Sequence, residues 1–171
     1  MLGAYLVKSD FYQVRPAQRK LLVANVTEMG YTLQIVIDCS DPHLLANWWA
    51  ETLGWHVEAQ DEAFIKRMVA EGKATEADTR VYNGAKVWRE GAAINSEKEK
   101  SPTTSRIYFQ GVPEAKVGKN RVHLDVRVGG DDPIKVRESL LARGATILYT
   151  GNQGGHTWLT MADPEGNEFC V

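Results

Sequence analysis

The chain has 171 residues and a formal net charge of −2, with 20 basic residues scattered among 22 acidic ones. This balance excludes the broad basic surface typical of nucleic-acid-binding proteins, and no apolar run approaches the roughly 20 residues of a membrane-spanning helix. The hydrophobic fraction of 43% is enough for one ordinary core, so global disorder is excluded as well.

The start of the chain and the two cysteines indicate the compartment. Residues 1–7 are apolar, but no basic residue precedes them, and Lys8 and Asp10 follow closely, so no secretory signal is predicted. Cys39 and Cys170 lie in apolar, strand-like runs, which favours buried free thiols in a cytoplasmic protein, with a disulfide between them left open.

The first recognisable module follows an N-terminal extension, residues 1–30. An apolar strand is predicted over 33–40. The next helix begins at Pro42, because Asp41 can accept hydrogen bonds from the free amides of the first turn and proline needs no amide partner there. Gly54 ends this helix in the left-handed conformation, and a strand resumes at 55–58.

The rest of the first module, which ends at 114, contains an insertion. Residues 61–79 place apolar side chains on one helical face among charged ones, so an inserted amphipathic helix is predicted there. Two strands follow, over 87–95 and 105–110.

The second module, residues 120–171, repeats the plan. Its predicted elements, in order, are a strand over 121–128, a helix over 133–143 with Asp132 as its cap, and strands over 145–149, 157–162 and 168–171. A glycine-rich segment, 151–155, is predicted as a turn that forms a mobile lid. Each module is therefore βαβββ, and the fold class is α+β: two modules set edge to edge form a cupped mixed sheet, with the cleft between them as the first candidate site.

Polar residues recur on one face of the two first strands. His123 and Asp125 share a face by the two-residue period of a strand, as do Gln34 and Asp38 on the partner strand. One interpretation is the polar floor of a pocket. The other is a hydrogen-bonded network that joins the modules, in which His123 is an ordinary core histidine.

The sequence resembles a known family. The segments that carry the resemblance are Val36 to Pro42, Trp48-Trp49 before Leu53-Gly54-Trp55, Phe109 to Glu114, Asn120 to Asp125 and Asp163 to Cys170. Over residues 31–171 they are similar to the glyoxalase-like domain of the vicinal oxygen chelate superfamily, which includes glyoxalase I, bleomycin-resistance proteins and extradiol dioxygenases. The resemblance implies the cupped fold and is consistent with a homodimer.

The resemblance also implies positions for metal ligands. The first-strand positions fall on Gln34 and His123, and the last-strand positions fall on Gln110 and Cys170. Glyoxalase I is similar but has carboxylates at the last-strand positions, one of which moves the substrate proton. Their absence here argues against glyoxalase I, although a shifted register could bring Glu168 into the site.

Two functions are therefore expected, and a third is weaker. The first is binding of a small organic molecule in the cup. The second is a lyase, isomerase or dioxygenase that uses a divalent metal held by His123 and Gln34. The third is an interaction module. The predicted pocket residues are Gln34, Asp38, Gln110, His123, Asp125, Trp158, Glu168 and Cys170.

Overall fold

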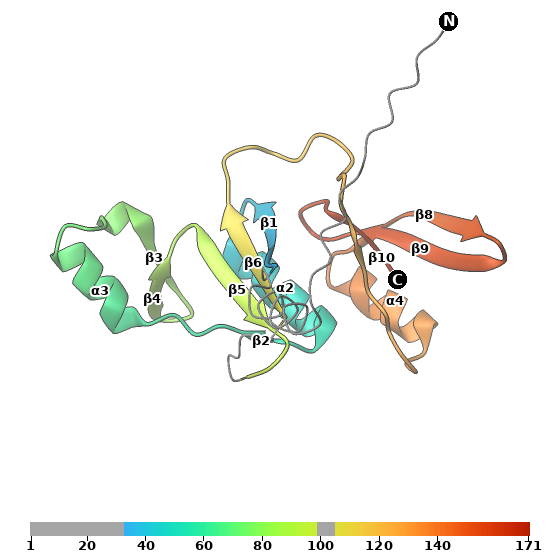
Figure 1. The fold of residues 1–171 in the computed structure, drawn as a ribbon, viewed down its shortest axis with the longest axis horizontal. Coiled ribbons are helices and arrows are strands. Elements are labelled where there is room, and N and C mark those ends of the chain that lie inside the picture. Colours follow the sequence, from blue (N-terminus) through green and yellow to red (C-terminus); the bar gives the residue numbers. More distant parts are fainter. Residues whose placement is uncertain (1–32, 99–104) are drawn as a thin grey trace, which may run out of the picture. The chain divides into compact units, whose positions relative to one another are not determined.

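The computed structural model describes residues 33–98 and 105–171 (Figure 1). The predicted extension, residues 1–30, lies outside the described residues. The chain divides into the units Met1–Leu33 and Gln34–Val171, and the second contains both predicted modules. No helix in the described ranges is long and apolar enough to cross a membrane.

The two modules have the same topology. Module one comprises β1 (Ile35–Cys39), α2 (Pro42–Leu53), β2 (His56–Val57), β5 (Gly91–Asn95) and β6 (Arg106–Gly111). Module two comprises β7 (Leu124–Asp125), α4 (Pro133–Ala142), β8 (Thr146–Gln153), β9 (His156–Ala162) and β10 (Glu168–Cys170). The sheet orders are β1-β6-β5-β2 and β7-β10-β9-β8, so in both sheets the first strand pairs in parallel with the last. The predicted duplication of a βαβββ unit is confirmed.

The main helices begin as predicted. The Asp41 carboxylate accepts from the amides of His43 and Leu44, each at 3.1 Å, and Gly54 ends α2 with φ of 65°. In module two the Asp132 carboxylate accepts from the amide of Ile134 at 2.9 Å. These caps satisfy amides that have no partner inside the helix, which fixes where each helix starts.

The insertion in module one is larger than predicted. The expected amphipathic helix is α3 (Glu62–Ala70), followed by the short 3-10 helix η1 (Glu76–Asp78). A hairpin of β3 (Thr79–Tyr82) and β4 (Ala85–Trp88) then forms a separate two-stranded sheet. Asn83 and Gly84 turn this hairpin with φ of 48° and 81°, which is the conformation that an Asn-Gly pair favours. The predicted strand 87–95 is therefore divided between β4 and β5.

Two predictions for module two were wrong in extent. The strand predicted over 121–128 is reduced to Leu124–Asp125. The segment 151–155 is not a loose lid, because β8 continues to Gln153 and pairs with β9 up to His156. Only Gly154 and Gly155 form the turn, with φ of 60° and 83°. A two-residue turn joins the strands, so the glycines close a hairpin.

One hydrophobic core joins the modules. It contains Leu45 and Phe109 from module one together with Met161 and Phe169 from module two. The Phe169 ring meets Trp49 of α2 edge to face, with ring centroids 5.2 Å apart. Trp48 and Trp49 of α2 are both buried.

Candidate functional site

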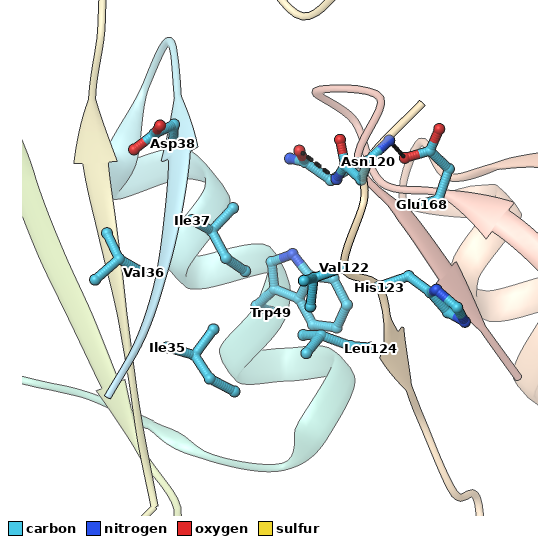
Figure 2. A pocket seen from close by; sticks show the side chains of 11 residues that line it. Ile35, Val36, Ile37, Asp38, Trp49, Asn120, Val122, His123, Leu124 and Glu168 are labelled. Atoms are coloured by element: carbon cyan, nitrogen blue, oxygen red, sulfur yellow. Dashed lines mark hydrogen bonds between the residues drawn. The ribbon is translucent and has the colours of Figure 1, made fainter. Parts of the chain in front are cut away.

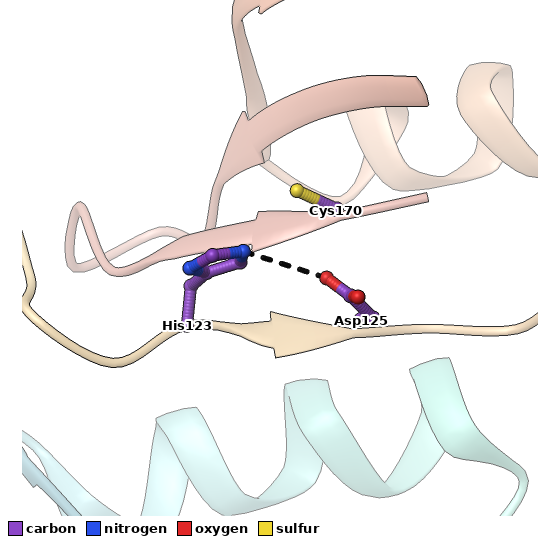
Figure 3. Close-up of side chains that lie close together, drawn as sticks. All are labelled: His123, Asp125 and Cys170. Carbon is purple, nitrogen blue, oxygen red and sulfur yellow. Dashed lines mark ion pairs between the residues drawn. The ribbon is translucent and has the colours of Figure 1, made fainter. Parts of the chain in front are cut away.

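Three side chains with metal-binding or acid–base chemistry converge on two neighbouring strands of module two. Cys170 of β10 lies opposite Asp125 of β7, and His123 precedes Asp125 by two residues. The His123 Nε2 atom is 3.5 Å from Asp125 Oδ1 (Figure 3). One imidazole nitrogen, one Asp125 oxygen and the Cys170 sulfur all lie within 4.8 Å of one another.

Strand alternation explains why these polar groups share a face. Leu124, between His123 and Asp125, packs against the core on the other side of the sheet, and Phe169, which precedes Cys170, belongs to that core. On the next strand Thr160 continues the polar face, and its hydroxyl lies 3.6 Å from the Cys170 sulfur. We refer to His123, Asp125, Cys170 and Thr160 as the polar cluster.

The polar cluster lies in a cavity of about 730 Å³ on module two. Its remaining lining residues include Lys119, Val126, Arg127, Tyr149, His156 and Trp158. A cavity of this size is in the range that holds a small organic ligand. We refer to it as the module-two cavity.

The aromatic wall of this cavity depends on a glycine. Trp158 lies opposite Gly151 in the β8–β9 pair, and a Cβ atom built on Gly151 would be 2.2 Å from the Trp158 ring. The indole therefore lies against bare backbone. The His156 ring is nearby, with centroids 6.3 Å apart.

A second, smaller cavity lies between the modules. It has a volume of about 250 Å³, and Figure 2 shows Ile35 and Ile37 on β1 facing Val122 and Leu124, with Trp49 among them. Asp38, His123 and Glu168 also line it. This volume is below the usual size for an organic ligand. His123 lines both cavities.

The structure gives Glu168 and Gln34 partners of their own. The Glu168 carboxylate accepts from the Asn120 amide at 3.0 Å and lies 3.3 Å from Lys116 Nζ. Desolvation acts to raise its pKa, but the hydrogen bonds and the lysine charge outweigh this and lower it. The Gln34 side chain accepts a hydrogen bond from Arg106, which also pairs with Glu58 at 2.7 Å. Gln34 is therefore engaged on module one.

The register also separates Gln34 from His123. Asp38 lies opposite Gln110 in module one, and Asp125 lies opposite Cys170 in module two. Each of these pairs directly follows a buried phenylalanine of the last strand, Phe109 or Phe169. Asp38 and Asp125 are therefore equivalent, and the residues two positions before them, Val36 and His123, are equivalent as well. The resemblance made Gln34 and His123 equivalent, but Gln34 precedes the cap Asp41 by seven residues and His123 precedes the cap Asp132 by nine. The connection from β7 to α4 is longer than that from β1 to α2.

The eight predicted pocket residues therefore fall into three groups. The structure brings His123, Asp125, Trp158 and Cys170 together in the module-two cavity, while Asp38 and Glu168 border the smaller cavity and Gln34 and Gln110 lie on module one. Sequence reasoning missed Thr160 and Tyr149. Thr160 could have been found, since it follows Trp158 by two residues on a predicted strand.

The polar cluster fits some divalent metals better than others. One imidazole, one carboxylate and one thiol are a donor set for zinc, which accepts three protein ligands and keeps a fourth position open. The thiol makes the set a poor one for magnesium or calcium, which prefer oxygen. His123, Asp125 and Cys170 are thus the residues that would hold a metal here.

A model of the glyoxalase-like domain matches residues 34–171. The chain belongs to the glyoxalase-like domain family. The match begins close to the first strand and covers both modules of this glyoxalase-like domain. No curated protein matches the sequence.

Several solved structures are similar to this glyoxalase-like domain at low sequence identity. A glyoxalase/bleomycin resistance protein/dioxygenase superfamily member from Sphaerobacter thermophilus is 16% identical, with a TM-score of 0.48, over 84% of this chain and 96% of that one. Glyoxalase I of Leishmania major is 16% identical, with a TM-score of 0.47, over 82% and 84%. A bleomycin-binding protein from Streptomyces verticillus is 15% identical, with a TM-score of 0.43, over 83% and 96%.

Proposed function

We propose that this glyoxalase-like domain binds a small organic molecule in the module-two cavity. The observation that carries the proposal is one cavity of about 730 Å³ that combines the aromatic Trp158 with the polar His123, Asp125 and Cys170. Ligand sites typically have an apolar wall and a few convergent polar groups. The proposed site therefore lies on module two and not in the expected cleft between the modules, and His123 lines both cavities.

The lining indicates the chemical class of ligand. Trp158 and Tyr149 offer flat apolar surface to an aromatic or unsaturated body. Among the described residues that line the cavity, Lys119 and Arg127 carry cationic side chains and Asp125 carries an anionic one. The two cationic side chains favour a ligand with an anionic or strongly polarised oxygen. We therefore expect an oxygenated compound with a planar apolar part.

A matched pair of tryptophan variants tests this proposal. Aromatic carboxylic acids and aryl ketones are screened by ligand-observed NMR, and the dissociation constant of the best compound is measured with each variant. Trp158→Leu is expected to weaken binding at least tenfold, roughly the effect of losing one aromatic contact wall. Trp88→Leu, on the hairpin of the insertion, is the control and should leave affinity unchanged. Equal affinity in Trp158→Leu and the native protein would contradict the proposal.

A metal-dependent lyase, isomerase or dioxygenase is the second candidate, favoured by the mutual proximity of His123, Asp125 and Cys170. A metal bound there would polarise an oxygen atom of the substrate as a Lewis acid. Metal content is measured on protein purified without chelator, and Zn²⁺ affinity is measured by titration. Stoichiometric metal that His123→Ala loses and the cavity variant His156→Ala keeps would support this candidate. Equal metal content in the native protein and His123→Ala would contradict it.

A further inference from the structure

We infer that Cys170 is a covalent attachment site for electrophilic ligands, of the class of α,β-unsaturated carbonyl compounds, that enter the module-two cavity. The inference rests on the proposed function, because the ligand must first occupy that cavity. It adds a bond-forming activity to simple binding, and it assigns that activity to one of the two thiols.

The two cysteines differ in burial and in their access to the module-two cavity. Cys39 is 4% exposed in the core, and its thiol donates to the carbonyl of Gln110 at 3.5 Å. Desolvation, aided by nearby carboxylates, raises the pKa of Cys39 to about 12. Cys170 is partly exposed and lines the module-two cavity. The module-two cavity therefore contains one of the two thiols, and the core holds the other, Cys39, which serves as an unreactive reference because burial suppresses its reactivity.

The groups around Cys170 suit addition to a carbonyl-activated double bond. The Thr160 hydroxyl, 3.6 Å from the sulfur, can donate to it. Lys119 and Arg127 line the same cavity and can attract the carbonyl oxygen, on which negative charge develops during addition. Trp158 offers a flat surface for an aromatic substituent of the ligand.

The reaction is a conjugate addition that balances without a co-reactant. A carbon–sulfur bond forms between Cys170 and the β-carbon, while the π bond of the alkene breaks and its electron pair moves to the enolate. The hydrogen lost by the thiol is delivered to the α-carbon by way of solvent water, so the numbers of protons and electrons are unchanged. The product is a thioether, and nothing is oxidised or reduced by an outside agent.

The test uses the full chain, reduced and treated with chelator, and two enones that differ only in a ring. Phenyl vinyl ketone and methyl vinyl ketone are each incubated with the protein, and adducts are located by intact-mass and peptide mass spectrometry. Each rate is divided by the rate of the same enone with glutathione. We expect one adduct, on Cys170, with phenyl vinyl ketone favoured at least tenfold over methyl vinyl ketone after this correction.

Three variants and the unfolded protein serve as controls. Cys170→Ser should form no adduct, and Cys39→Ala should form the same adduct as the native protein. Trp158→Leu should lose the preference for the phenyl compound while Cys170 still reacts slowly. Unfolding in guanidinium should make both cysteines react, which shows that folding protects Cys39.

Two results would overturn the inference: no modification of Cys170 in the folded protein, or modification with no preference over glutathione. Propiophenone, the saturated analogue of phenyl vinyl ketone, separates this failure from failure of the proposed function. If propiophenone binds the native protein and Cys170→Ser but phenyl vinyl ketone forms no adduct, the proposed ligand binding is supported and the covalent step is contradicted. If propiophenone does not bind and no adduct forms, both proposals fail.

Discussion

The Glu165 carboxylate accepts two hydrogen bonds from Ser40, one from the backbone amide at 2.7 Å and one from the hydroxyl at 2.8 Å. A third comes from the amide of Asp41 at 2.9 Å. Glu165 lies in the turn between β9 and β10, whereas Ser40 immediately precedes the cap of α2. The turn of module two therefore supplies a negative charge to the start of the main helix of module one, where the helix dipole favours it.

The first prediction concerns this link. Glu165→Ala removes all three hydrogen bonds, so the free energy of unfolding should fall by about 1–3 kcal/mol. Urea denaturation followed by tryptophan fluorescence measures the change. Glu138→Ala, at an exposed position on α4, is the matched control and should change stability by less than about 0.5 kcal/mol. Equal stability of the two variants would show that the link does not hold the modules together.

A second carboxylate of the same turn is buried. One Asp163 oxygen accepts from the Trp49 indole at 3.0 Å, and the other accepts from the amides of Glu165 and Asn167 at 3.0 and 2.9 Å. Hydrogen-bond donors face both Asp163 oxygens. The side-chain NH2 group of an asparagine at this position would therefore face a donor whichever way it turned. Asp163→Asn should therefore cost about 1–3 kcal/mol of stability at neutral pH, even though its shape is preserved.

Asp163 also predicts a pH dependence. Desolvation raises its pKa above the ordinary aspartate value, against the opposing effect of its hydrogen bonds. The folded state therefore holds this proton more tightly than the unfolded state. The stability that this contributes is present below the unfolded pKa and is lost as pH rises through the folded pKa. The free energy difference between native protein and Asp163→Asn should thus be larger near pH 4 than near pH 7. A constant difference in denaturant titrations would contradict this.

The βαβββ repeat could be predicted from the sequence because the residues that indicate its helices lie close together in the chain. Asp41-Pro42 and Asp132-Pro133 start helices through caps that depend on two or three residues, and Gly54 ends one by its own conformation. The hairpin at Asn83-Gly84 carried an equally local signal, but the neighbouring strand pattern ran continuously through Trp88 and concealed it. Local rules therefore placed both modules and the inserted helix, but they missed the hairpin of the insertion and gave the wrong extent to two segments of module two.

The site was only partly predictable, because sheet register is a non-local property. The family resemblance aligned His123 with Gln34, but the pairing with the last strand aligns it with Val36. The period of two correctly placed His123 and Asp125 on one face. It could not show that Gln34 is held by Arg106, since that contact joins residues far apart in the chain.

Gly151 provides a prediction for the cavity itself. Gly151→Ala would place a Cβ 2.2 Å from the Trp158 ring, so the indole must move. Tryptophan emission should shift, and affinity for an aryl ligand of the cavity should fall about tenfold. Gly130→Ala is the control, because no atom lies within 4 Å of a Cβ built there. If both variants bind the ligand like the native protein, the Gly151–Trp158 contact does not shape the cavity.

Measurements of Zn²⁺ affinity test which residues would hold a metal: the polar cluster that the structure brings together, or a set that includes Gln34 and Gln110. Gln34 is bonded to Arg106 and Gln110 pairs with Asp38 on module one, so Gln34→Ala and Gln110→Ala should leave Zn²⁺ affinity unchanged. Cys170→Ser should weaken it on the order of 100-fold, because the thiolate is the strongest zinc ligand of the cluster. Competition with a chromogenic chelator measures all three variants. A tenfold loss in Gln34→Ala would place Gln34 at the metal and require the modules to close around it.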